Sequence, residues 1–388
     1  MAEELEGNFV SSYNLQTETP LVIDNMIYSL EPQDLPMLTG VGANGLPVLS
    51  SSPTADTIFY WMEERAPLPR GTCAEAIDSS ETVIDMTTGD AIKFAIGDTV
   101  RIDDENMLVT DIDAASSPET ITVTRAYAGT SAATHANGSE VIGVGTVLPE
   151  GDVGSSNFVG RDKYSNYTQI WSKTLRMTGT EQVIRKYGIP SELAHQMVKQ
   201  TQHLYLGMEQ SALYGIKYQD TTTRKRQTGG LDNWITTNED TTTDWLTIGA
   251  IQDQQQAVYD LGGAFTHIVA RPKAFDALNN LDGSERITSV SIDDARRGRR
   301  EALTVMTDFG VVNLIRNRWV RATEAFGYSP DRFTRRVLRP MMVQRLAKTD
   351  DTDTFLLICE AGYMMKGQVH AVKWTGLDTS AALPSVLV

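Results

Sequence analysis

The stretch at residues 191–215, SELAHQMVKQTQHLYLGMEQSALYG, decides the architecture of this chain. Residues suited to one buried helix face recur there at spacings of three and four: Leu193, Met197, Thr201, Leu204, Met208 and Ala212. Ser191 is a suitable N-cap, and Gly215 is suited to a left-handed stop. At 1.5 Å per residue, the predicted helix is roughly 36 Å long. The pattern therefore predicts one long amphipathic helix.

The composition is that of a globular protein with a strongly acidic balance. The chain has 388 residues, enough for two or three domains, and 50 acidic against 34 basic residues give a net charge of −16. Such a field argues against nonspecific nucleic-acid binding by the protein as a whole. It does not exclude an acidic wall that holds packed DNA without gripping it.

The cysteines and the N-terminus indicate the compartment. Cys73 and Cys359 lie far apart, which gives neither a disulfide framework nor a zinc-site spacing, and two free thiols in a reducing cytosol are expected. The N-terminal MAEELEGNF has the features of neither a signal peptide nor an anchor, and no apolar run reaches the ~20 residues of a membrane span. We therefore expect a soluble protein that folds in the cytoplasm without membrane contact.

The first half of the chain reads as an arm followed by a hairpin that carries an insertion. Residues 1–55 are polar and rich in proline, which predicts an extended arm without its own core. Residues 57–65 and 164–178 read as two matching strands. Between them, residues 78–148 contain short strands separated by turn dipeptides such as Gly89-Asp90 and Asn137-Gly138. This spacing predicts a small β-barrel or sandwich inserted into a long hairpin.

The second half alternates strands with helices. Thr247 is a suitable N-cap for a helix that ends near Leu261, and FTHIVA at residues 265–270 reads as a buried strand. Pro272 suits a first helical turn. Further strands are predicted at residues 311–316 and 354–360. The pattern is that of an α/β half.

Motifs that could carry chemistry have simpler explanations. GVGANG at residues 40–45 is followed by Leu46-Pro47, so no helix can start there to bind a dinucleotide, and a turn is expected. His195 and His203 lie two turns apart on the long helix, too far to bind one metal without a third element. Asp350, Asp351 and Asp353 lack the glycine and distal glutamate of a calcium loop and read as a turn between strands. We therefore expect no catalytic, cofactor or metal site.

Two groups of arginines interrupt the acidic composition: Arg296, Arg297, Arg299 and Arg300, and then Arg332, Arg335, Arg336, Arg339 and Arg345. Solvated charge, contacts to a neighbouring subunit and contacts to DNA phosphates are all compatible with them. The sequence does not choose between these three interpretations.

Several stretches together resemble a known family. They are EQSALYG at 209–215, GDTVRIDDENMLVTDI at 97–112, TVTRAYAGTSAATHANGSEV at 122–141 and TDFGVVNLIRNRWV at 307–320. In order and spacing the chain resembles the Hong Kong 97-type major capsid protein of tailed bacteriophages, in the subgroup with a β insertion in the extended loop. The resemblance covers nearly the whole chain.

The resemblance implies an α+β fold divided into named parts. Residues 1–55 would form the N-terminal arm, and residues 56–180 the extended loop, with the β insertion at 78–148. Residues 181–224 and 333–388 would form the peripheral domain around a spine helix at 191–215. Residues 225–332 would form the axial domain.

The resemblance also implies a structural protein rather than an enzyme. Copies of the chain would form pentamers and hexamers of an icosahedral virion shell, assembled in the host cytoplasm, with packaged double-stranded DNA on its inner face. A separate scaffolding protein and a portal are expected, because no scaffolding segment precedes the short arm, and a decoration or cement protein is a further candidate. An encapsulin-like compartment, an enzyme that uses the barrel as a substrate domain, and a sugar- or surface-binding role for the barrel are the alternatives.

The residues expected at subunit contacts come from the strands of the arm and from the arginine groups. Trp61 and Trp171 fall on the two arm strands, where an indole would be exposed unless a neighbour covers it. The full predicted contact set is Trp61, Arg65, Trp171, Lys173, Arg296, Arg297, Arg335 and Arg336. A hinge between the arm and the spine helix is predicted at Gly179, Gly188 and Pro190.

Overall fold

The fold is taken from a computed structural model, which describes residues 34–39, 49–64, 69–151, 161–184, 191–279, 304–348 and 350–378. The predicted turn at residues 40–45 lies outside these ranges. Within them, none of the helices combines the length and hydrophobicity of a membrane span. The chain divides into two compact units: Met62–Tyr164 forms one, and Met1–Trp61 together with Ser165–Val388 forms the other.

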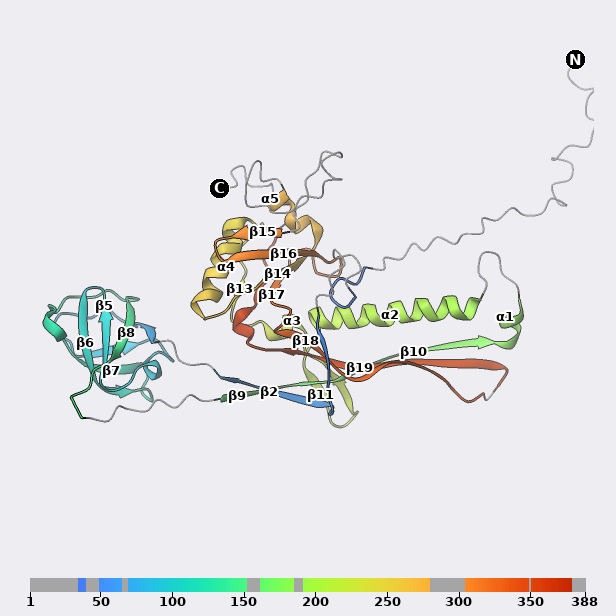
Figure 1. Ribbon diagram of the computed structural model, residues 1–388, viewed down its shortest axis with the longest axis horizontal. Coiled ribbons are helices and arrows are strands. Elements are labelled where there is room, and N and C mark those ends of the chain that lie inside the picture. Colours follow the sequence, from blue (N-terminus) through green and yellow to red (C-terminus); the bar gives the residue numbers. More distant parts are fainter. Residues whose placement is uncertain are drawn as a thin grey trace, which may run out of the picture. The chain divides into compact units, whose positions relative to one another are not determined.

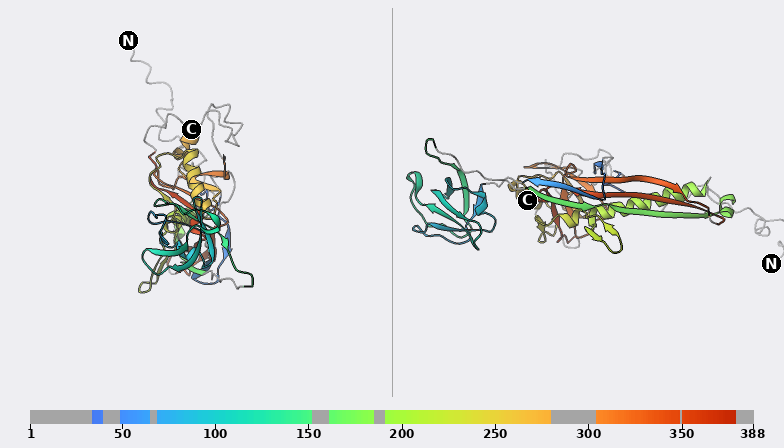
Figure 2. Two further views of the ribbon diagram at one scale, coloured as in Figure 1. Left: turned by 90° about the vertical axis from the view of Figure 1, so that its left-hand side faces the viewer. Right: turned by 90° about the horizontal axis from the view of Figure 1, so that it is seen from below.

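A long four-stranded sheet and one helix form one of the hydrophobic cores of the larger unit (Figure 1). The strand order is β1-β18-β19-β10, with β1 at Ser51–Pro53, β18 at Phe333–Arg345, β19 at Thr352–Met365 and β10 at Gln169–Thr178. The helix α2, Glu192–Tyr214, runs along β10 and β19 (Figure 1, Figure 2). These elements come from three distant parts of the sequence: residues 51–53, 169–214 and 333–365.

The face of the sheet that packs on α2 follows from strand alternation. Trp171 of β10 lies opposite Cys359 of β19, so both side chains are on one face, and Leu357 and Tyr363 follow on the same face. The Tyr363 hydroxyl also donates a hydrogen bond of 2.8 Å to the Met208 carbonyl oxygen of α2. Aromatic packing and this bond together fix the helix on the sheet.

The predicted helix is confirmed almost to the residue, and so is its N-cap. The Ser191 hydroxyl accepts a hydrogen bond from the Ala194 N–H at 3.4 Å. The predicted left-handed stop at Gly215 is wrong, because φ is −60° and ψ is 139° there, an extended conformation. Glycine is required for space instead: a Cβ at this position would lie 2.4 Å from the Thr228 carbonyl oxygen.

Only the C-terminal half of the predicted helix face is fully buried. Leu204, Met208 and Ala212 are at most 2% exposed, whereas Leu193 and Met197 are half-buried. Periodicity correctly identifies which side of a helix is apolar. It cannot show how far along the helix a covering sheet extends, because that depends on strands distant in sequence.

The second sheet has six strands in the order β13-β20-β17-β14-β16-β15. Their bounds are Glu239–Asp240, Val372–Trp374, Ala325–Tyr328, His267–Ala270, Gly310–Arg316 and Thr304–Thr307. Helix α4, Ile248–Asp260, packs on this sheet and begins at the predicted cap, since the Thr247 hydroxyl accepts a hydrogen bond from the Ala250 N–H at 3.1 Å. The 3-10 turn at Pro272–Phe275 and the short helix α5, Asp276–Asn279, pack in the same core. The short helix α3, Leu231–Trp234, packs against α2 instead.

Strand β20 does not follow the predicted domain boundary at residue 333, which put all of residues 333–388 in the peripheral domain. It belongs to the six-stranded sheet rather than to the sheet of β18 and β19, and its Val372 and Trp374 side chains are fully buried in the core beside α4. The chain therefore returns to the second sheet near its end. Sequence separation gave no sign of this return.

The smaller unit is a six-stranded barrel with the strand order β3-β8-β5-β6-β7-β4. The bounds are Arg70–Thr72, Glu140–Thr146, Asp98–Ile102, Glu105–Asp113, Glu119–Thr124 and Val83–Met86. A bridge between Cys73 and Met86 joins the two end strands and closes the barrel. The predicted short strands are confirmed, and the sequence reading missed β3 because only three residues form it.

The predicted strand at residues 164–178 is two strands with different partners. β9, Arg161–Tyr167, pairs with β2, Ile58–Glu64, whereas β10 belongs to the long sheet. Thr168 separates them, and its side chain is buried against Glu360. The small hairpin of β11, Tyr218–Asp220, and β12, Lys225–Gln227, follows α2.

The packing of α2 predicts a contrast between two substitutions. Met208→Ala removes a fully buried side chain and should lower the free energy of unfolding by about 2–5 kcal/mol, because a cavity remains. Val198→Ala on the same helix is the matched control, since Val198 is 58% exposed and the change should stay within about 0.5 kcal/mol. Denaturant unfolding of the unassembled chain measures both. Equal losses would contradict the assigned buried face.

Candidate assembly surfaces

A buried carboxylate connects three distant segments of the larger unit. Glu209 of α2 accepts hydrogen bonds from the backbone N–H groups of Met37 and Leu38 at 3.0 and 3.1 Å. Its Oε1 also accepts one from the Asn317 side chain at 2.8 Å. Asn317 directly follows β16 of the second sheet. One side chain thereby holds the N-terminal segment, the long helix and the second sheet together.

Burial also changes the acidity of this group. Desolvation raises the pKa of Glu209 to about 7, although the hydrogen bonds from Met37, Leu38 and Asn317 act in the opposite direction. The burial of Glu209 was not predicted from the sequence. It could have been, because Glu209 precedes the buried Leu213 by four residues and therefore lies on the packed side of the helix.

A second buried carboxylate lies in the middle of the long sheet. Glu360 of β19 accepts hydrogen bonds from Arg226 Nη2 at 2.9 Å, Arg339 Nε at 2.8 Å and the Thr168 hydroxyl at 2.8 Å. Arg339 comes from the adjacent strand β18 and Arg226 from β12. The paired guanidinium groups compensate the buried charge and tie the β11–β12 hairpin to the sheet.

Asn166, at the end of β9, is an uncharged buried side chain that also joins distant segments. Its side-chain amide nitrogen donates to the Tyr363 and Gly229 carbonyl oxygens at 2.6 and 3.0 Å, and its oxygen accepts from the Gly229 N–H at 3.0 Å. The residue is fully buried. Because both ends of the amide are satisfied, this asparagine fixes the position of the chain just before β10 begins.

The predicted contact residues Trp61 and Trp171 are both covered by their own chain. Trp61 is 8% exposed and packs edge-on against Trp234, with ring centroids 5.2 Å apart. Trp171 is 9% exposed and packs against Tyr363 at 6.5 Å. The argument from an exposed indole therefore does not apply to them. A contact of either residue with a neighbouring subunit stays a prediction.

Three basic residues of the predicted contact set lie in the described part of the chain, and all three are on the long sheet. Lys173 is exposed on β10, opposite Leu357. Arg335 and Arg336 are half-buried on β18, where Ser51 and Ser52 of β1 pair with them. Arg65, Arg296 and Arg297 lie outside the described residues. The structure brings Lys173, Arg335 and Arg336 into one sheet without testing their role in assembly.

Gly179, part of the predicted hinge, has a close packing contact. A Cβ at this position would lie 2.9 Å from an Asp351 carboxylate oxygen, and the Gly179 N–H donates to the Asp351 carbonyl oxygen at 3.0 Å. Close approach explains the glycine without any requirement for flexibility. Gly188 and Pro190, the other predicted hinge residues, lie outside the described residues, so the hinge stays a prediction.

Asp350 and Asp351 lie between β18 and β19, as predicted, whereas Asp353 is already the second residue of β19. Asp350 pairs with Arg176 and Asp353 with Arg345, each at 2.8 Å. These surface pairs lie at the end of the long sheet, where solvent screening leaves them little weight in stability.

A row of apolar side chains on β2 remains exposed. Tyr60 is 54% exposed and Met62 is 68% exposed, whereas the alternate residues Phe59 and Trp61 are buried. Aromatic and methionine side chains are enriched in protein interfaces. This outward row was not part of the predicted contact set, although the alternation of IFYWMEE contains it.

The barrel has its own polar core around Glu105. Arg125 forms a bidentate pair with Glu105 at 2.8 Å, and His135 Nε2 lies 3.1 Å from the same carboxylate. Burial would raise the pKa of Glu105, but the hydrogen bonds from Arg125 and the Ala133 and Ala126 N–H groups outweigh it and lower the pKa to about 2. This network holds the β7–β8 connection against the barrel.

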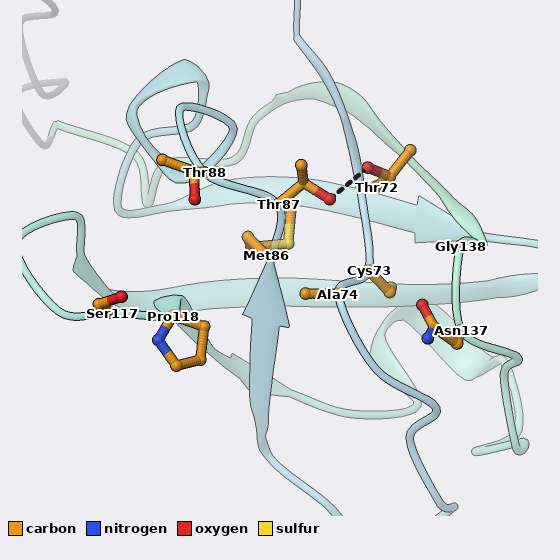
Figure 3. Close-up of a pocket in the computed structure, with 10 residues that line it drawn as sticks. All are labelled: Thr72, Cys73, Ala74, Met86, Thr87, Thr88, Ser117, Pro118, Asn137 and Gly138. Atoms are coloured by element: carbon orange, nitrogen blue, oxygen red, sulfur yellow. Dashed lines mark hydrogen bonds between the residues drawn. The ribbon is translucent and has the colours of Figure 1, made fainter.

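A depression of about 640 Å³ lies beside the bridge that closes the barrel, and Figure 3 shows the residues that line it. Its wall carries hydroxyl, amide and apolar groups, and the Thr72 and Thr87 hydroxyls lie 2.7 Å apart. The Cys73 thiol is buried, which raises its pKa to about 11 and keeps it protonated. None of the lining residues is a charged acid or base: Thr72, Cys73, Ala74, Met86, Thr87, Thr88, Ser117, Pro118, Asn137 and Gly138. The described residues also contain no cluster of three metal-ligating side chains.

Comparison with known proteins matches nearly the whole chain to one protein family. The family model described as SU10 major capsid protein matches residues 8–378. No curated protein matches the chain.

Similar solved structures show the same fold. The structure of Microbacterium phage Oxtober96 has a TM-score of 0.52 at 10% identity and covers 95% of this chain and 99% of its own. The capsid of Myoviridae phage XM1 has a TM-score of 0.50 at 12% identity and covers 96% and 100%. The SrpI encapsulin of Synechococcus elongatus PCC 7942 has a TM-score of only 0.41 at 12% identity, covering 59% and 81%, which carries no argument for an encapsulin.

The raised pKa of Glu209 predicts a pH-dependent stability. Unfolding lowers the pKa from about 7 towards 4.5, so the folded state binds more protons between these values. The contribution of this group is fully present below the lower value and is lost as the pH rises through about 7. Wild type should lose up to about 3 kcal/mol between pH 4.5 and pH 8 from this site. Glu209→Gln should lack this component in denaturant unfolding at both pH values. An identical pH dependence of wild type and Glu209→Gln would contradict it.

Proposed function

This chain belongs to the SU10 major capsid protein family, and we propose that its copies interlock through the β2–β9 ribbon and the long sheet to build the phage head. It is a major capsid protein of the Hong Kong 97-type fold, a structural protein that assembles with copies of itself into the shell of a tailed double-stranded DNA bacteriophage. The way in which the copies interlock is the subject of the proposal.

The exposed row on β2 supports the role of the ribbon. Tyr60 and Met62 present apolar area at positions where a solvated strand would carry polar residues. An isolated two-stranded ribbon is marginally stable in water. Contact with a neighbouring copy would bury the row and stabilise the ribbon, which matches the predicted extended loop at residues 56–180.

The long sheet offers a receiving surface on the face opposite α2. Ile170 is 48% exposed there, and Ile358 and Met342, which share that face by register, are half-buried. Glu360 and its two arginine partners keep this face ordered. An apolar strip bordered by ion pairs has the composition of a subunit interface. Of the predicted contact residues, Arg336 shares this face by register, whereas Lys173 and Arg335 lie on the α2 face. The full set is still proposed as further contacts: Lys173, Arg335, Arg336, Arg65, Arg296, Arg297, Trp61 and Trp171.

The remaining assignments follow the family. We propose that the six-stranded sheet unit, predicted as the axial domain at 225–332, closes pentamers and hexamers around their axes. Double-stranded DNA lies on the inner face, a scaffolding protein and a portal take part in assembly in the host cytoplasm, and the chain acts by assembly rather than catalysis. Gly179, Gly188 and Pro190 remain the proposed hinge.

Two charged residues introduced on β2 test the interlocking proposal. Tyr60→Glu combined with Met62→Glu leaves the buried residues of the strand intact, so the chain should fold. It should stay as small oligomers, because each buried carboxylate would cost several kcal/mol at every contact. Light scattering and negative-stain microscopy of the purified chain, with the proteins needed for wild-type assembly, measure the outcome.

The matched control is Ile92→Glu, which places a carboxylate at a 67% exposed site on the barrel. Shells of normal yield from this control, and none from the β2 variant at equal melting temperature, are the expected result. Normal shells from the β2 variant would overturn the interlocking proposal while leaving the family assignment untouched.

A further inference from the structure

The side of α2 that carries Glu209 loses its cover toward the start of the helix. Glu209 is fully buried, and Tyr205, one turn earlier, is half-buried against the same core. Val198 precedes Glu209 by eleven residues, which is about three turns, so it lies on the same side of the helix. Its side chain is 58% exposed, and Ala194, a further turn away, is exposed too. An apolar strip on the first half of α2, residues 192–203, is therefore uncovered within the described ranges.

The chain is anchored at the covered end of this strip, just before the point where its description begins. Asp34 pairs with Arg318 at 2.7 Å, and its carbonyl oxygen accepts a hydrogen bond from the Trp319 indole N–H at 2.8 Å. Three residues later, the Met37 N–H donates to the Glu209 carboxylate at 3.0 Å. The segment that precedes Asp34 therefore starts beside the second half of α2.

The sequence before this anchor predicts a short amphipathic helix over residues 20–30. Thr19 is a suitable N-cap, and Pro20 suits the first helical position. Pro32 sets the end, because the residue before a proline disfavours the helical conformation. Between these residues, apolar side chains recur at the spacing of one helix face: Ile23, Met26, Ile27 and Leu30. Residues 19–32 lie outside the described ranges, so this helix is a prediction from the sequence.

The predicted helix has a reason to dock and the length to cover the strip. Helices of about eleven residues are marginally stable alone in water, so this one needs a surface that buries its apolar face. At 1.5 Å per residue it would be about 16 Å long, and the uncovered half of α2 is about 18 Å long. The link from Leu30 to Asp34 spans at most about 14 Å, which is close to the distance of about 16 Å between Val198 and Glu209 along the helix axis.

We propose that residues 20–30 dock as an amphipathic helix on the first half of α2 in the same chain, with their apolar face over Val198 and Ala194. The tether selects this occupant over a second copy of the chain. Four residues between Leu30 and Asp34 hold the segment beside the strip at an effective concentration in the millimolar range. The docked segment covers the apolar strip in the unassembled chain, and the proposal does not depend on the ribbon contacts described above.

Hydrogen exchange, measured by mass spectrometry on the purified and unassembled full-length chain, tests the docking. The amides of residues 20–30 should exchange at least about tenfold more slowly than those of a synthetic peptide of the same sequence, because so short a helix is protected only when docked. Val198→Glu places a charge in the contact and should remove this protection, and so should Ile27→Glu on the other side of the contact. Residues 204–213 should keep their wild-type exchange in both variants, which shows that α2 still folds.

The matched control is His203→Glu, at an exposed position on another side of α2, which should leave the protection of residues 20–30 within about twofold. Wild-type amides that exchange as fast as the synthetic peptide would overturn the proposal, as would protection that survives both Val198→Glu and Ile27→Glu. Protection that is lost on dilution, together with dimers in light scattering, would also overturn it, because the strip would then be covered by a second copy.

Discussion

The carboxylate of Glu209 joins segments that lie more than 100 residues apart. It accepts hydrogen bonds from the backbone of Met37 and Leu38 and from the side chain of Asn317. A buried acid without such partners would cost several kcal/mol, so the three segments must meet for the helix to pack. The hydrogen bonds of this one carboxylate therefore fix the positions of the α2 helix, the N-terminal segment and the second sheet within an apolar core.

Other buried polar side chains also join distant segments through their hydrogen bonds. Glu360 holds β18, β19 and β12 through two arginines, and Asn166 holds the end of β9 beside Tyr363. In the barrel, Glu105 performs this function with Arg125 and His135. Apolar contacts supply most of the folding free energy, but they tolerate shifts in register. Directional bonds that must all be satisfied at once restrict the packing to one arrangement, which a subunit repeated many times in a shell requires.

The larger unit and the barrel differ in net charge. The larger unit is nearly balanced between acidic and basic residues, as suits a body that contacts copies of itself on several sides. The barrel is strongly anionic. The contacts proposed for assembly lie on the long sheet and the β2–β9 ribbon rather than on the barrel.

The sequence alone determined the local elements and their order. The spacing in residues 191–215 and the caps Ser191 and Thr247 predicted two helices almost to the residue, and turn dipeptides located the barrel strands. These features depend on neighbours a few residues away, which a linear sequence contains. Only the tertiary structure decided that Gly215 is extended, that residues 164–178 divide between two sheets, that β20 returns to the second sheet, and that Trp61 and Trp171 are covered within the chain. Each of these depends on which distant strand or carboxylate lies alongside, and that choice is made by packing and hydrogen bonding across the whole fold.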